Sequence, residues 1–288
     1  MIRSMTAFAR CERQAQWGRL TWELRSVNHR YQEVTVRLPE DLRAIEPAVR
    51  ERVGASLRRG KVECNLRLRA DPGAVPEIAV NAQYLDRLLE ACRLVQGRLE
   101  TAAPPGSLDL LRWPGVVAEA ERDLGPVMNA ALEALDEALA DMVATRRREG
   151  EQIAVWLRSR CEAMASEVTR VRARLPAVRQ QLREKVLARL AEVGVETDPG
   201  RLEQELVFQA QKMDVDEELD RLEGHLEEVG RVLERREPVG RRLDFLMQEF
   251  NREANTLASK SADAEATRAA VELKVLIEQM REQVQNVE

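Results

Sequence analysis

The chain has 288 residues, of which 44% are hydrophobic, 33% are charged and only 3% are aromatic. This composition favours long solvated helices over a β-sandwich or a β-barrel. No stretch reaches the roughly 18–20 consecutive apolar residues of a membrane span, and the first residues lack the apolar segment of a signal peptide. The four cysteines are widely spaced and form no CxxC or Cys/His pair, which argues against a disulfide framework and a structural zinc site. We therefore expect a cytoplasmic protein that does not bind membranes.

Charge is distributed unevenly along the chain. Residues 1–70 contain 15 Lys and Arg against 8 Asp and Glu, whereas the rest of the chain is acidic and the total formal charge is −5. Most of the basic residues are arginine, which binds phosphate through two parallel hydrogen bonds and stacks on bases. An excess of arginine over lysine also follows from genomic base composition. The N-terminal segment is nevertheless where an anionic partner is expected.

The first seventy residues alternate as strands do. Apolar residues recur with a period of two in 18–27, 34–38 and 62–68, and a helical segment begins near Pro39 and ends near Leu57. The sequence therefore predicts an α+β fold class, in which a small, largely antiparallel sheet forms an N-terminal domain over residues 1–75.

Helical periodicity follows from about residue 80, with helices expected over 81–100, 126–193, 199–235, 240–260 and 262–286. The 126–193 stretch contains Glu149-Gly150 and Pro176, so it is either two helices or one long arm with coiled-coil-like stripes. Such arms usually pack against another copy of the chain, so an oligomer is expected. We assign residues 76–200 to a helical arm and residues 201–288 to a C-terminal helical region.

Common nucleotide, zinc-peptidase and hydrolase signatures are absent from the sequence, and there are two histidines. His29 ends a predicted strand together with Arg25, Asn28 and Arg30, which places several hydrogen-bond donors in one turn. These residues could clamp a phosphate or a base edge. Alternatively, Asn28 and His29 shape a hairpin turn and the arginines are solvated.

His225 shares one helix face with Glu218 and Arg221, at spacings of i, i+3 and i+7. Carboxylates with one imidazole could bind Mg²⁺ or Mn²⁺, and the imidazole could instead act as a general acid or base. The alternative is an exposed helix face stabilised by ion pairs such as Glu217–Arg221.

The 240–260 segment has the densest pattern. Beside an apolar stripe it carries a second stripe of Asp244, Gln248, Asn251 and Asn255, and a third that includes Glu249, Arg252 and Glu253. Asn has a low helix propensity, so several amides on one helix indicate that they are hydrogen-bonded to something. That partner is either a ligand or a buried polar network that holds helices or subunits in register.

With these motifs in view, the chain resembles the YicC/YloC family of bacterial endoribonucleases. The similarity rests on MIRSMTAFAR, WELRSVNHRY, RLPEDLR and RRGKVECNLRLR near the start, and on PVGRRLDFLMQEFNREANTLASKSADAE and ELKVLIEQMREQVQNVE near the end. Residues 81–200 match only in character. Ala7, Ala9 and Ala258 stand where the family tends to have glycine, which affects turn geometry and removes no chemical group.

The resemblance implies a cytoplasmic, ring-like homo-oligomer, expected to be a hexamer, that cuts RNA internally with help from Mn²⁺ or Mg²⁺ and takes part in RNA decay, where other decay enzymes are possible partners. Motif position and chemistry then suggest the residues. The expected catalytic residues are His225, Glu249, Arg252 and Glu253, and the expected metal ligands are Glu218, Glu249 and Glu253. The expected RNA-binding residues are Arg25, Asn28, His29, Arg30, Arg59, Lys61, Gln248, Asn251, Asn255 and Lys260.

Three functions remain open at this point: a metal-assisted endoribonuclease, a non-catalytic adaptor and a helical scaffold. If the RNA's own 2′-hydroxyl attacks, metal matters less and His225 or His29 matters more. The chain could instead be a non-catalytic adaptor that presents RNA to other nucleases, or a helical scaffold with no nucleic-acid role. The scarcity of aromatic residues would suit the scaffold, because base stacking needs them.

Overall fold

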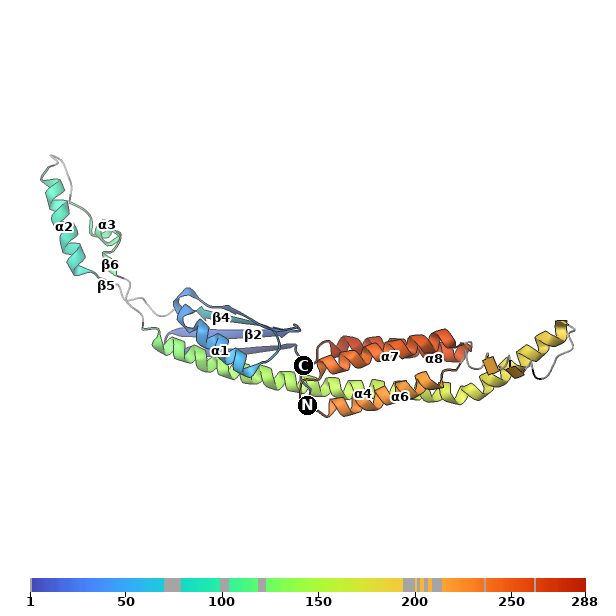
Figure 1. Cartoon of the computed structure of the whole chain (residues 1–288). Helices are drawn as coiled ribbons and strands as arrows, with labels where there is room; N and C mark the ends of the chain where they lie inside the picture. The colour runs from blue at the N-terminus through green and yellow to red at the C-terminus, as the bar shows by residue number, and fades with distance from the viewer. Residues whose placement is uncertain are drawn as a thin grey trace.

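The computed structural model describes residues 2–69, 79–98, 104–118, 123–193, 200, 203–204, 207–208, 214–235, 237–261 and 263–288. Its elements include a four-stranded sheet and one helix, α4, that runs along most of the molecule (Figure 1). The sheet packs on the first part of α4, and the helices α6 and α8 pack on a later part, with α7 packed against α6 and α8. The predicted α+β class is therefore confirmed.

The sheet has the strand order β1-β2-β4-β3, with β1 at Ala7–Ala15, β2 at Gly18–Val27, β3 at Gln32–Arg37 and β4 at Gly60–Arg69. The β1–β2 and β2–β4 pairs are antiparallel and β3–β4 is parallel, so the sheet is mixed. The connection from β3 to β4 contains η1 at Glu40–Ile45 and α1 at Glu46–Ser56. Such a crossover is what a parallel pair requires.

One face of this sheet is covered and the other is open. Apolar side chains of β2 and β4 alternate inward and pack with α1 and with residues 127–142 of α4. Trp22 is fully buried, and its indole Nε1 donates a hydrogen bond to the carbonyl of Ala131 at 2.7 Å, which satisfies its one polar atom. The remaining side chains of these strands extend from the opposite, open face.

Helix α4 spans Gly125–Val193 without interruption, which confirms the alternative of one long arm. Gly150 does not end the helix. A Cβ at this position would lie 2.3 Å from the carbonyl oxygen of Ile2, so the glycine allows the N-terminal segment to cross α4 at close range. Pro176 also lies inside the helix. The expected stripes of α4 pack against this chain's own sheet and helices.

Three helices complete the second core: α6 at Asp216–Leu233, α7 at Gly240–Lys260 and α8 at Ala264–Val284. Their buried faces enclose a cluster with residues 153–171 of α4. Asp263 caps α8 by accepting hydrogen bonds from the backbone N–H groups of Glu265 and Ala266. Part of the helix predicted over 199–235 and the break predicted at residues 71–73 lie outside the described residues.

The two cores meet where both ends of the chain cross α4 (Figure 1). Ser4 pairs with Val287, and the backbone N–H of Met5 donates to the carbonyl of Asn286 at 2.7 Å. Arg146, at 1% exposure, donates to the carbonyls of Ser4 and Arg59 and to the carboxylate of Glu288. Burial lowers the pKa of this guanidinium. One buried cation therefore links the sheet, both ends of the chain and α4.

A smaller segment projects from the sheet end of α4 (Figure 1). It consists of α2 at Ala82–Gln96, α3 at Ser107–Leu111 and a short antiparallel pair of β5, Ala79–Val80, with β6, Val117–Ala118. None of the residues of α2 is buried. Among the described residues, no helix is long and apolar enough to cross a bilayer.

Candidate metal centre and nucleic-acid interface

Helices α6 and α7 are antiparallel and face each other along a row of charged residues, which we call the α6–α7 seam. At one end, Lys260 Nζ lies 2.8 Å from Glu218 Oε1. At the other, Arg242 Nη2 lies 3.3 Å from Glu228 Oε1. The seam residues on α6 are spaced three or four apart, which keeps them on one helix face; they are Glu218, Arg221, His225 and Glu228.

A cluster of three possible metal ligands lies in the middle of the seam. His225, Glu249 and Glu253 each offer one ligand atom, and these atoms lie within 4.8 Å of one another. Glu249 and Glu253 are one turn apart on α7, and His225 reaches them from α6. Two carboxylates and an imidazole form a donor set that fits a divalent cation, and the imidazole favours a first-row transition metal such as Mn²⁺ over Mg²⁺.

The cluster is supported by neighbouring side chains. The ring of Phe250 meets the imidazole of His225 edge to face, with 5.8 Å between centroids, which restricts how the imidazole can turn. Glu253 is only 3% exposed, and Arg221 Nη1 lies 3.4 Å from its Oε1. Glu217 and then Glu253 raise the pKa of the Arg221 guanidinium. Arg221 thus provides a positive charge beside a carboxylate that is otherwise shielded from water.

Arg252 lies at the outer edge of the cluster. Its side chain is 71% exposed, and its Nη1 lies 4.0 Å from Glu249 Oε2, so it is only loosely held. A guanidinium in this position can swing toward a phosphate that approaches the carboxylates. The role expected for Arg252, as a donor to a phosphodiester, stays a prediction.

Glu218 is not part of this cluster. Its side chain is 5% exposed, and its partner is Lys260, seven residues beyond Glu253 at the end of α7. Its second oxygen, Oε2, is buried and has no hydrogen-bond partner among the described residues. Glu218 and Lys260 therefore form an ion pair one or two turns from the cluster. The sequence had instead predicted that Glu218 binds metal and that Lys260 binds RNA.

The amide stripe of α7 lies on another side of the helix. At 3.6 residues per turn, Asn251 and Asn255 point about 160° away from Glu249 and Glu253, respectively. These side chains pair along the helix, since Asn255 Nδ2 donates to Asn251 Oδ1 at 2.7 Å and Gln248 Nε2 donates to Asp244 Oδ2 at 3.0 Å. The stripe faces solvent, so it neither lines the metal cluster nor forms a buried network in this chain.

The N-terminal candidates fall into two groups. Asn28, His29 and Arg30 occupy the turn between β2 and β3, where His29 Nδ1 lies 3.1 Å from the carbonyl oxygen of Tyr31. Arg59 joins this turn by donating from Nε to the carbonyl of His29 at 3.2 Å. The second group, Arg25 and Lys61, extends from the open face of the sheet. His29 and His225 do not share a cluster.

Two exposed aromatic residues near the candidate sites were not predicted from the sequence. Phe245 is 49% exposed and lies one turn before Glu249 on the same side of α7, with the Arg242 guanidinium 5.9 Å from its ring centroid. Tyr31 is 61% exposed and has Arg30 5.2 Å from its ring centroid. Aromatic and guanidinium planes of this kind stack on unpaired bases. The i, i+4 spacing of Phe245 and Glu249 was the available signal.

Comparison with known proteins agrees with this arrangement of two parts. Residues 2–155 match the family profile described as endoribonuclease YicC-like, N-terminal region, and residues 171–288 match endoribonuclease YicC-like, C-terminal. The chain is 46% identical to a probable endoribonuclease YicC from Haemophilus influenzae and 29% identical to one from Clostridioides difficile, with all of both chains covered in each case. The chain therefore belongs to the YicC-like endoribonuclease family.

Proposed function

We propose that this protein is an endoribonuclease that cleaves RNA internally with a divalent metal held by His225, Glu249 and Glu253. The observation that carries this proposal is the convergence of these three donors from two helices, their ligand atoms within 4.8 Å of one another. The names of the relatives support an RNA substrate. We place the protein in the cytoplasm and in bacterial RNA decay, as the family resemblance implies.

In this proposal, different side chains bind the cation, stabilise the transition state and position the RNA. His225, Glu249 and Glu253 would hold the cation, which supplies positive charge that stabilises the phosphodiester transition state. Arg252 would add a second positive charge from the solvent side, because its guanidinium is exposed and loosely held. Phe245 would stack on a base next to the scissile bond, which fixes the position of the RNA relative to the cluster.

The decisive experiment uses an end-labelled RNA of about 30 nucleotides incubated with Mn²⁺, with Mg²⁺ and with EDTA. We expect internal cleavage with metal, no cleavage in EDTA, and at least about a hundredfold loss of rate in Glu249→Gln and His225→Ala. Glu272→Gln is the matched control, because it removes one exposed carboxylate from α8. The variants should keep the circular dichroism and the oligomer size of the original protein.

Other outcomes would assign a different function. Cleavage that persists in EDTA but is lost in His225→Ala would indicate attack by the 2′-hydroxyl, with the imidazole as base. Binding without cleavage under every condition would favour an adaptor that presents RNA to another nuclease. Normal cleavage by both variants would show that the active site lies elsewhere.

We also propose that the protein works as a homo-oligomer, with the hexamer that the family resemblance implies. The support is the smaller segment with α2 and α3, which projects from the sheet end of α4. It has no buried residue in α2 and exposes Leu94 at 68%, Leu108 at 69% and Trp113 at 52%. Exposed apolar side chains on one projecting segment form a surface suited to packing against a second copy of this chain. Light scattering on the eluted protein would give the number of subunits, and Leu94→Ser with Leu108→Ser should reduce it.

A further inference from the structure

The open face of the sheet carries a strongly charged surface that the metal centre does not use. Its cations are more numerous than its anions: seven basic residues, Arg10, Arg19, Arg25, Arg37, Lys61, Arg67 and Arg69, against four glutamates, Glu12, Glu23, Glu33 and Glu63. No apolar layer or helix covers this face in the described residues, because α1 and α4 both pack on the other one.

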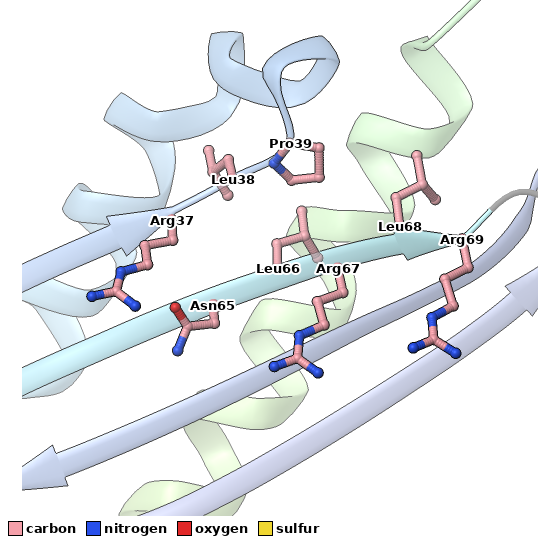
Figure 2. Close-up of a pocket in the computed structure, with 8 residues that line it drawn as sticks. All are labelled: Arg37, Leu38, Pro39, Asn65, Leu66, Arg67, Leu68 and Arg69. Carbon is pink, nitrogen blue, oxygen red and sulfur yellow. The ribbon is translucent and has the colours of Figure 1, made fainter.

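The positive charge is concentrated where β3 and β4 end. Arg37, Arg67 and Arg69 line a shallow pocket there together with Asn65, and we call these three arginines the distal arginine cluster. Figure 2 shows the three guanidinium groups and Asn65 extending from one side of the sheet, whereas Leu66 and Leu68 extend from the other. The backbone register explains the grouping, since Arg37 on β3 lies opposite Asn65 on β4.

These arginines are largely unneutralised. Arg67 has one distant partner, Glu23, at 3.6 Å. Within the described part of the chain, the side chains of Arg37 and Arg69 have neither an ion pair nor a hydrogen bond. By contrast, several exposed arginines of the helices pair with a carboxylate three or four residues away, as Arg43, Arg147 and Arg170 do. Cations held in a row without counter-charges attract a polyanion.

We propose that the distal arginine cluster binds the phosphate backbone of single-stranded RNA at a distance from the metal centre, and so holds the substrate while it is cut. This proposal rests on the proposed function, because that function makes RNA the ligand. Outward residues on one strand, such as Arg67 and Arg69, are about 6.8 Å apart. This distance is similar to the spacing of successive phosphates in an extended strand.

The chemistry of the cluster also predicts that its binding to RNA does not depend on the RNA sequence. The pocket is lined by arginines, one asparagine and aliphatic residues, with no aromatic ring among them. Contacts to phosphate without stacking or base-edge bonds carry no sequence information and depend on salt. The cluster should therefore add affinity equally for all sequences.

The test is fluorescence anisotropy with a labelled 30-nucleotide RNA, in EDTA so that the RNA remains intact, at several salt concentrations. In the triple variant Arg37→Gln/Arg67→Gln/Arg69→Gln we expect binding about tenfold weaker for both a mixed sequence and oligouridine. The slope of log Kd against log salt should fall by about 2, as expected for three lost contacts to a single strand.

Two further variants complete the design. Arg43→Gln/Arg147→Gln/Arg170→Gln removes the same charge from paired surface arginines and should leave the slope unchanged. Arg37→Lys/Arg67→Lys/Arg69→Lys keeps the charge and should restore most of the binding. The proposal is overturned if the triple glutamine variant binds RNA as the control variant does, even if RNA is still cleaved. Failure of cleavage in the original protein with this slope change intact would reject the nuclease and keep the RNA-binding surface.

Discussion

The sheet and the bundle of α6, α7 and α8 both contact α4, but charged residues are placed differently in the two. On the sheet, charged residues extend from the open face, and Arg25, Arg37 and Arg69 have no ion-pair partner among the described residues. In the helical part, the α6–α7 seam has charged residues between two helices, and two carboxylates, Glu218 and Glu253, are only a few per cent exposed. Unpaired surface cations suit a polyanion, whereas carboxylates that converge with an imidazole, as Glu249 and Glu253 do with His225, suit a cation.

Under our proposals, the chain separates RNA binding on the sheet from RNA cleavage in the α6–α7 seam. The sheet has a wide open face on which many weak contacts with phosphates would add up. The α6–α7 seam offers a narrow site where few groups are fixed by packing and by ion pairs such as Arg221–Glu253. Between the two parts lies a junction, where the ends of the chain lie close to Gly150 of α4 and Gly240 of α7 and where buried Arg146 donates its hydrogen bonds.

The largest effect is expected when this junction is broken. In Gly240→Ala, the new Cβ would lie 2.1 Å from the carbonyl oxygen of Val287, and in Gly150→Ala 2.3 Å from that of Ile2. Both contacts are with backbone, which cannot move aside cheaply, so each variant should lose about 3 kcal/mol of unfolding free energy. Urea unfolding measures this loss.

Gly230→Ala is the control for the junction variants. It also lies in a helix, but a Cβ there meets nothing within 4 Å. It should gain up to about 1 kcal/mol, because alanine favours the helix. Equal stability of all three variants would mean that the two ends of the chain do not lie against Gly150 of α4 and Gly240 of α7 as described.

A second prediction separates the two buried carboxylates of the seam. Glu253→Gln should weaken Mn²⁺ binding, measured by calorimetry, at least about tenfold, because it removes one ligand of the cluster. Glu218→Gln should leave Mn²⁺ affinity unchanged and instead lower the unfolding free energy by about 1–2 kcal/mol, because it removes the partner of Lys260.

This pair of variants also decides the role of Glu218, which the sequence placed among the metal ligands. Lys260→Met should reproduce the loss of stability, whereas Lys274→Met, on the exposed side of α8, should not. If Glu218→Gln weakens Mn²⁺ binding as much as Glu253→Gln does, the cation lies further along the seam than the three-residue cluster indicates.

Local pattern predicted much of the secondary structure. The period-two runs marked β2, β3 and β4, and α7 begins and ends where the sequence placed it. Strand β1 was missed because only Ala9 among its nine residues is buried, so the alternation carries no apolar signal. The parallel pairing of β3 with β4 was missed for a different reason, since strand order depends on contacts distant in sequence.

The candidate site, too, could be predicted only in part from the sequence. Sequence spacing placed Glu249 and Glu253 one turn apart and put His225 on another helix, because helical periodicity is local. Tertiary structure decided which groups met: antiparallel packing of α6 on α7 brought His225 to the two glutamates, matched Glu218 with Lys260 and turned Asn251 and Asn255 to the other side of α7. Likewise the sequence located the basic N-terminal region, but only the fold of the sheet gathered Arg37, Arg67 and Arg69 on one face, because neighbouring strands come from distant parts of the chain.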